Sequence, residues 1–130
     1  MDYNTFFVGM DVHKEKFSLC CYSIEKDEFS HPYTTAADYK HVLTYIVSLR
    51  NVFGENAFFL CGYEAGCLGF TLYHQLTEHN VNCIILAFIT MPVVKGKKIK
   101  TDKRDARNIA KCMAHHDYSP VHIPTEQVFL

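Results

Sequence analysis

Runs of apolar residues mark the places where the chain is expected to form strands. Residues 5–12, 57–63 and 82–88 are largely apolar and rich in aromatic and β-branched side chains. Such runs are typical of strands that are covered on both faces of a sheet. Residues 16–24 alternate between polar and apolar positions, and residues 29–33 follow them across a polar turn. The pattern therefore predicts five strands, of which the first three form a meander of hairpins.

Apolar positions three and four residues apart predict three helices between and after these strands. The first opens at residues 34–38, where a threonine three residues before an acid forms a capping box, and it ends near Gly54. The second covers about residues 67–79, and the third contains residues 102–113. The third helix carries an apolar stripe that must lie against a core, formed by Ala106, Ile109, Ala110 and Met113.

The order of these elements predicts an α/β domain. A three-strand meander followed by two crossover strands gives a mixed five-stranded sheet with helices on both faces. A chain of 130 residues makes one domain, which we assign to residues 1–118, and residues 119–130, with two prolines, are expected to leave it as an extended tail. No apolar run is long enough to cross a bilayer, and the N-terminus lacks a signal-peptide pattern. We therefore expect a cytoplasmic protein that does not bind membranes, whose six cysteines are buried thiols rather than disulfides or zinc ligands.

Charge is distributed unevenly along the chain. Residues 1–90 carry five Lys and Arg against ten Asp and Glu, whereas residues 91–130 carry eight against four. All eight of these cations lie within the 17 positions of residues 95–111. A basic block on an otherwise acidic domain predicts a local surface for binding a polyanion, although a solvated helix face has a similar composition.

Four acids occupy positions where a sheet of this kind forms its sites. Asp11 lies at the end of the first predicted strand and Glu64 directly follows the fourth. The carboxyl ends of parallel strands meet at one edge of a sheet. Asp102 and Asp105 are three residues apart, so a helix there would place both at the buried rim of the third helix. Alternatively, Asp102 is only an N-cap and Asp105 interacts with the helix dipole.

Four crowded carboxylates require a counter-cation to stay ionised. Two Mg²⁺ ions would satisfy Asp11, Glu64, Asp102 and Asp105, and would clamp the attacking and leaving oxygens of a displacement at phosphorus. These four residues are the candidate metal ligands and catalytic residues. The candidate nucleic-acid-binding residues, which would hold a phosphodiester backbone, are Lys14, Lys95, Lys97, Lys98, Lys100, Lys103, Arg104 and Arg107.

Three short motifs, in this order, carry a resemblance to a known family. They are Gly-Met-Asp-Val-His-Lys at residues 9–14, Tyr-Glu-Ala-Gly at residues 63–66 and Lys-Thr-Asp-Lys-Arg-Asp-Ala at residues 100–106. Together they resemble the N-terminal domain of the insertion-sequence-one-hundred-and-ten family of transposases, and the match spans nearly the whole chain. The four acids fall where the family motif has its acids.

The resemblance implies an RNase H-like (RuvC-like) fold with a DEDD set of acids, dependence on Mg²⁺ with Mn²⁺ as a substitute, and cleavage and exchange of DNA strands during transposition. It also implies a structured guide RNA, a homo-oligomer and a second, C-terminal domain that carries a serine nucleophile. We therefore expect this chain to be a fragment that is inactive alone.

Other interpretations of the same residues stay open. The acids could be structural in a module that only binds DNA or guide RNA, or they could serve a stand-alone RuvC-like nuclease. An actin-like nucleotide-binding half is a third candidate, but no second phosphate loop is visible. His13 could contact a phosphate or a metal-bound water, or simply be an exposed residue of a turn.

Overall fold

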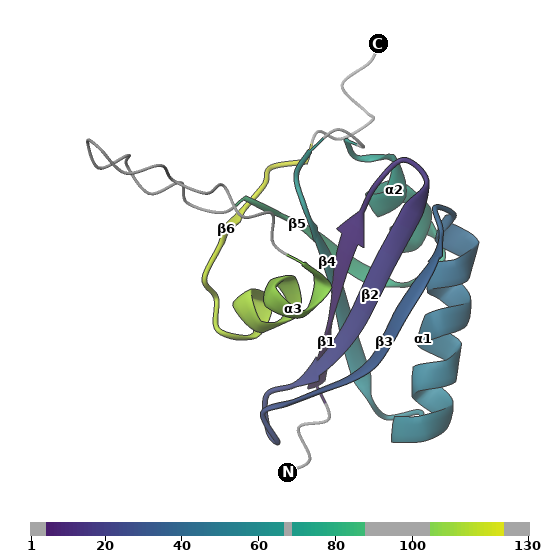
Figure 1. The fold of residues 1–130 in the computed structure, drawn as a ribbon, viewed down its shortest axis with the longest axis vertical. Helices are drawn as coiled ribbons and strands as arrows, with labels where there is room; N and C mark the ends of the chain where they lie inside the picture. Colours follow the sequence, from purple (N-terminus) through teal and green to yellow (C-terminus); the bar gives the residue numbers. More distant parts are fainter. Residues whose placement is uncertain (1–4, 67–68, 88–104, 124–130) are drawn as a thin grey trace.

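The computed structural model describes residues 5–66, 69–87 and 105–123. The elements follow in the order β1 (Thr5–Val12), β2 (Lys16–Ser23), β3 (Glu28–Ala36), α1 (Tyr39–Phe53), β4 (Phe58–Glu64), α2 (Thr71–Glu78), β5 (Asn82–Ala87), α3 (Ala106–Ala114) and β6 (Ser119–Pro120) (Figure 1). This is the mixed α/β architecture that the sequence predicts. None of the described helices is long and apolar enough to cross a bilayer.

The six strands of the described residues form one mixed sheet in the order β3-β2-β1-β4-β5-β6. The first three strands are an antiparallel meander, β1, β4 and β5 are parallel, and β6 is antiparallel to β5. The predicted count of five strands is wrong, because Ser119 and Pro120 pair with Ala87 and Leu86 at the edge of the sheet. A two-residue strand is too short to leave a hydrophobic pattern, and an edge tolerates the missing N–H of a proline.

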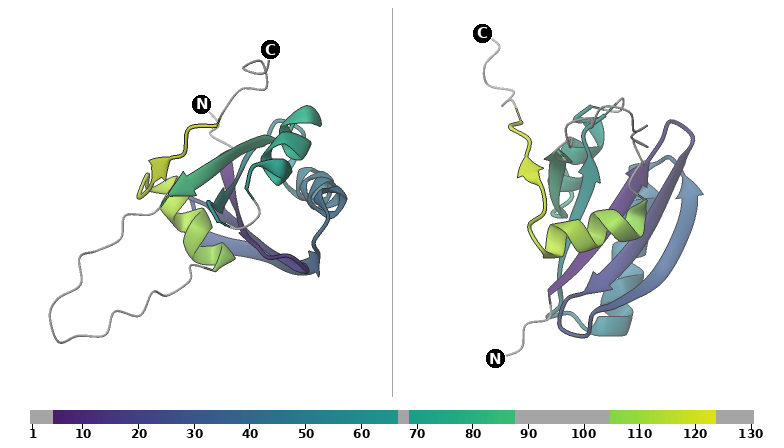
Figure 2. Two further views of the ribbon diagram at one scale, coloured as in Figure 1. Left: turned by 90° about the horizontal axis from the view of Figure 1, so that it is seen from above. Right: turned by 60° about the vertical axis from the view of Figure 1, so that its left-hand side comes forward.

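Helices cover both faces of the sheet, as predicted (Figure 2). On one face, Val8 and Met10 of β1 and Cys61 of β4 pack in a core that also contains Val42 and Leu49 of α1. On the other face, Ile109 and Met113 of α3 pack with Leu86 of β5, and Ala110 packs with Tyr22 of β2. Burial on both faces explains why β1, β4 and β5 are such continuous apolar runs.

The start of the first helix differs from the prediction. The helix α1 begins at Tyr39, where the Asp38 carboxylate accepts a hydrogen bond from the Lys40 backbone N–H at 2.9 Å. The proposed threonine cap is wrong because Thr34 and Thr35 belong to β3 and pair with β2. The predicted end of this helix is confirmed at Gly54, whose φ of 99° suits a residue without a side chain.

The predicted apolar stripe of the third helix is confirmed. Its four members, Ala106, Ile109, Ala110 and Met113, are all buried. The expectation that Asp105 lies within this helix is wrong, because Asp105 has an extended backbone and is the N-cap of α3. Asp102 lies outside the described residues, so the pairing of the two acids on one face stays a prediction.

Candidate functional site

Asp11 and Glu64 lie next to each other on parallel strands. The β1–β4 ladder pairs Gly9 with Gly62 and Met10 with Tyr63, so the next position along both strands is Asp11 beside Glu64. Neighbouring strands are about 4.8 Å apart. Met10 and Tyr63 point into the core under α1 and α2, and side chains alternate along a strand. Both carboxylates therefore face the side of the sheet that α3 covers.

A glycine in β1 lets α3 lie directly on the sheet beside these acids. A side-chain carbon added at Gly9 would overlap the carbonyl oxygen of Ala106 and would lie 2.5 Å from the backbone nitrogen of Ala110. The backbone of the helix thus occupies the space where a side chain of β1 would otherwise be. Because Gly9 precedes Asp11 by two residues and Ala106 follows Asp105, this contact places the start of α3 on the face that carries Asp11.

The start of α3 is fixed by Asp105. Its Oδ1 accepts a hydrogen bond from the Asn108 backbone N–H at 2.9 Å, which satisfies one of the free donors at the helix end. Asp105 also lies near Cys20, the partner of Gly9 in the β1–β2 ladder. Burial raises the pKa of the Cys20 thiol, Arg107 lowers it, and Asp105 adds to the increase. Asp105 thus lies near the Gly9–Cys20 pair, which is two residues before Asp11 on β1.

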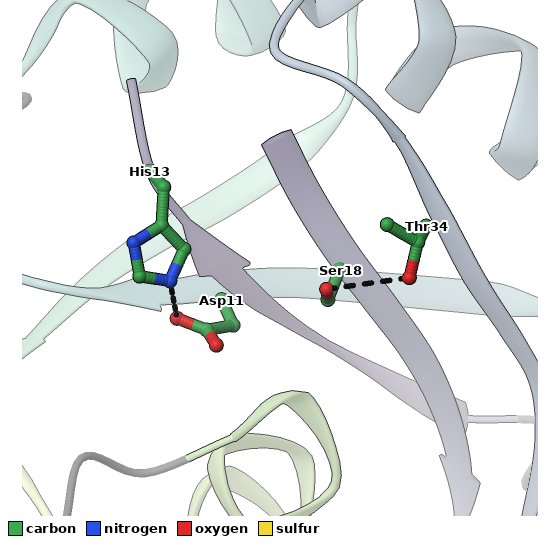
Figure 3. A network of polar contacts seen from close by, with 4 residues as sticks. All are labelled: Asp11, His13, Ser18 and Thr34. Carbon is green, nitrogen blue, oxygen red and sulfur yellow. Dashed lines mark hydrogen bonds and ion pairs between the residues drawn. The ribbon is translucent and has the colours of Figure 1, made fainter. Parts of the chain in front are cut away.

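Asp11 is bonded to a histidine from its own strand end. The Nε2 atom of His13 lies 3.1 Å from Oδ1 of Asp11, and the two side chains are 44% and 20% exposed (Figure 3). Sequence reasoning considered His13 as a phosphate contact or a turn residue and missed this pairing. The available signal was the separation of two positions, which puts both side chains on one face of an extended segment.

Sequence reasoning also missed a row of hydroxyls beside Asp11. The ladders pair Asp11 with Ser18 of β2, and Ser18 with Thr34 of β3. The hydroxyl oxygens of Ser18 and Thr34 lie 3.4 Å apart and share a hydrogen bond, drawn beside the Asp11–His13 pair in Figure 3. Neither residue stands out in the sequence, because only the register of the strands brings them next to the acids.

Two of the predicted nucleic-acid-binding residues, Lys14 and Arg107, lie within the described residues. Lys14 is exposed in the turn between β1 and β2, at the same end of β1 as Asp11. Arg107 is exposed on α3, and its guanidinium carbon lies 4.8 Å from the centre of the Phe29 ring. The other predicted cations, Lys95, Lys97, Lys98, Lys100, Lys103 and Arg104, lie outside the described residues, as does Asp102.

The described acids form an incomplete ligand set. Within residues 5–66, 69–87 and 105–123, no three His, Cys, Asp or Glu side chains are arranged to hold a metal ion together. Asp11 and Glu64 lie at neighbouring strand ends on one face of the sheet, and Asp105 lies at the start of the helix that covers this face. Carboxylate oxygens are the ligands that Mg²⁺ prefers, so the donor chemistry fits this ion.

Comparison with known proteins shows which family the chain belongs to. The sequence model of the IS110-type DEDD transposases, described as "Transposase", matches residues 8–129. The chain belongs to this transposase family. The match includes all four predicted acids and confirms the resemblance carried by the three motifs.

Two relatives illustrate the membership in the IS110 family. The chain is 36% identical over 107 residues to the transposase for insertion sequence element IS1533 of Leptospira borgpetersenii, which covers 82% of the chain. It is 29% identical over 126 residues to the protein named "Putative transposase y4qE" of Sinorhizobium fredii, which covers 96% of the chain. The aligned segments make up 30% and 32% of these relatives, so the chain spans about a third of their length.

Proposed function

We propose that this chain is the metal-dependent DNA-cleaving domain of an insertion-sequence transposase with an RNase H-like fold. The observation that carries the proposal is the position of Asp11 beside Glu64 at the carboxyl ends of parallel strands, on the face that α3 covers. Sites in α/β sheets form at such strand ends. Membership in a transposase family supplies the class of reaction.

In the proposed site, Asp11 and Glu64 hold Mg²⁺ or Mn²⁺, and Asp105 and Asp102 complete the set. A divalent ion bound there would polarise the phosphodiester and activate the attacking oxygen. The contact from His13 orients the Asp11 carboxylate, as hydrogen bonds from neighbouring residues orient metal ligands in general. The partly positive end of α3 lies on the same face and favours carboxylates and phosphates near it.

DNA is the proposed substrate of this site. Lys14 and Arg107 are exposed on the described surface, and the cations of residues 95–104 extend the positive charge along the sequence. Such charges bind the phosphate backbone without reading its sequence. The relatives are about three times as long as this chain. We assign the binding of a structured guide RNA, the formation of a homo-oligomer and strand exchange in the cytoplasm to the proposed role of such a whole transposase.

The test is binding of Mn²⁺ to the chain, measured by electron paramagnetic resonance. Asp11→Asn and Glu64→Gln should each weaken Mn²⁺ binding at least about tenfold, which corresponds to about 1.4 kcal/mol. Glu78→Gln, at the end of α2, is the matched control and should bind Mn²⁺ as the original chain does. Equal Mn²⁺ affinity in Asp11→Asn, with an unchanged circular dichroism spectrum, would contradict the proposal.

A second function is a module that binds nucleic acid without cutting it. One observation favours it: Lys14 and Arg107 are exposed, and such cations bind a phosphate backbone whether or not it is cut. This module would not nick plasmid DNA, it would bind DNA with the same affinity whether or not Mn²⁺ is present, and Asp11→Asn would leave DNA binding unchanged. Nicking in Mn²⁺ that Asp11→Asn abolishes would exclude the second function.

A further inference from the structure

A polar row crosses four strands of the sheet next to the acids. The ladders pair Asp11 of β1 with Ser18 of β2, and Ser18 with Thr34 of β3. On the other side of Asp11, Glu64 directly follows Tyr63, the last residue of β4 that pairs with β1. In the preceding row, Gly9 pairs with Cys20, and Cys20 is 2% exposed. In the next row, by contrast, the side chains reach the surface, because Ser18 is half-buried and Thr34 is exposed.

Lys16 adds a cation beside this row, two residues from Ser18 on the same strand. The His13 backbone N–H donates to the Lys16 carbonyl oxygen at 3.0 Å, which places Lys16 across from His13 at the start of β2. Phe17 and Leu19 point into the core under α1 and α2, so Lys16 and Ser18 face the other side. The side chains of Lys16, Ser18 and Thr34 thus project from the face that carries Asp11.

We propose that Lys16, Ser18 and Thr34 form a subsite for one backbone phosphate of the DNA strand that enters the Asp11–Glu64 site. This inference rests on the proposed function, and it names the path of the substrate across β2 and β3. Neither Lys16 nor the two hydroxyls belong to the basic segment of residues 95–111.

The chemistry of the three side chains suits a phosphate. The Lys16 ammonium supplies positive charge, and phosphate oxygens accept hydrogen bonds from serine and threonine hydroxyls. The two hydroxyls are already 3.4 Å apart, so one phosphate oxygen can meet both. Ser18 is one strand spacing, about 4.8 Å, from Asp11. A phosphate held by Ser18 and Thr34 would therefore lie beside the carboxylates without competing for them.

The strand arrangement leaves a path for the DNA. In the described part of the chain, β3 is the outer strand of the sheet and has no strand partner on its far side. The helix α3 lies over the rows of Gly9 and Phe7 rather than over Thr34. A DNA strand can thus approach over β3 and β2 and reach Asp11 along the polar row.

The test measures binding of a fluorescein-labelled DNA duplex to the full chain by fluorescence anisotropy, in EDTA and at several salt concentrations. Lys16→Ala should reduce the slope of log affinity against log salt by about 0.9, the loss of one phosphate contact on duplex DNA. The double variant Ser18→Ala/Thr34→Val should lose about threefold to tenfold in affinity, as expected for a small number of hydrogen bonds.

Matched controls come from the rest of the molecule. Lys26→Ala removes an exposed lysine from the turn between β2 and β3. Ser48→Ala/Thr44→Val removes two hydroxyls that bond carbonyl oxygens of their own helix, α1. Both controls should leave affinity and slope unchanged. If Lys26→Ala lowers the slope as much as Lys16→Ala does, the binding is diffuse and the subsite is overturned.

The Mn²⁺ titration separates the two proposals. A chain that binds Mn²⁺ through Asp11 but shows no selective loss in the Lys16 and hydroxyl variants keeps the proposed function and overturns the subsite. A chain that shows the selective loss but never binds Mn²⁺ keeps the subsite as a DNA contact and overturns the metal-dependent function.

Discussion

At the scale of single residues, the site depends on a position where no side chain fits. Gly9 lies in the first of the three motifs, two residues before Asp11, and α3 packs on its backbone. Gly62, its partner on β4, faces the tip of Met113 instead. The two glycines therefore differ in how much the neighbouring atoms can move, since a methionine side chain adapts and a helix backbone does not.

Three glycine-to-alanine variants should rank by this difference. Gly9→Ala should lower the free energy of unfolding by about 1–3 kcal/mol or more, because the new carbon meets backbone atoms of Ala106 and Ala110. Gly62→Ala, which meets the Met113 sulfur at 2.6 Å, should cost less. Gly66→Ala is the control, since its nearest neighbour would be 3.9 Å away. Urea unfolding measures all three, and equal stability of Gly9→Ala and Gly66→Ala would contradict the close contact.

At the scale of elements, Asp105 has a structural role and a proposed ligand role that one pair of variants can separate. Asparagine caps a helix about as well as aspartate, whereas alanine costs about 1 kcal/mol. Asp105→Asn should therefore keep the stability of the chain and weaken Mn²⁺ binding, while Asp105→Ala should lose both. The measurements are urea unfolding and the Mn²⁺ titration.

The control for Asp105 is the other capping aspartate. Asp38 caps α1 with a bond of the same length, 2.9 Å, to the Lys40 N–H. Asp38→Ala should lose stability as Asp105→Ala does and should bind Mn²⁺ normally. If Asp105→Asn binds Mn²⁺ as tightly as the original chain, Asp105 is a cap and not a ligand.

Local pattern was enough to predict most elements, and long-range pairing decided the rest. The bounds of β1 follow from its continuous apolar run, and the buried face of α3 follows from apolar residues at helical spacing. The capping box at residues 34–38 misled because Thr34 and Thr35 gain more by pairing with β2 than by starting a helix. Helix propensity and strand pairing compete there, and only the partner strand settles the outcome.

The candidate site could be predicted only where its residues end a strand. Asp11 and Glu64 follow recognisable apolar runs, so their shared position at one edge of the sheet follows from the order of the elements. Ser18 and Thr34 could not be found in this way, because a hydroxyl in a strand has no pattern of its own. Their relation to Asp11 is a matter of register, which depends on the turns between the strands.

At the scale of the whole molecule, the two-sided burial of the sheet governs how the thiols behave. Cys21, Cys61 and Cys83 lie in the core under α1 and α2. Burial raises the pKa of Cys21 and of Cys83 from 9.0 to about 12, and raises that of Cys61 well above its usual value. These thiols ionise more readily in the unfolded chain, so a rise in pH above their ordinary pKa stabilises the unfolded state relative to the folded one.

The chain should therefore lose stability in alkali through its core. Below pH 9 the contribution of Cys83 to stability is fully present, and it is lost as pH rises from 9 toward the folded pKa of about 12, at up to about 1.4 kcal/mol per pH unit.

Urea unfolding between pH 7 and pH 10.5 should show this decline, and Cys83→Ala should make it shallower. Ser48→Ala, which removes a hydroxyl of α1 that does not ionise in this pH range, should leave the slope unchanged. Tyr22, whose pKa its hydrogen bond to Asp27 raises to about 12, adds to the loss above pH 10 equally in both variants. A slope in Cys83→Ala equal to that of the original chain would mean that this thiol ionises as easily in the folded protein as in the unfolded one, which its burial should prevent.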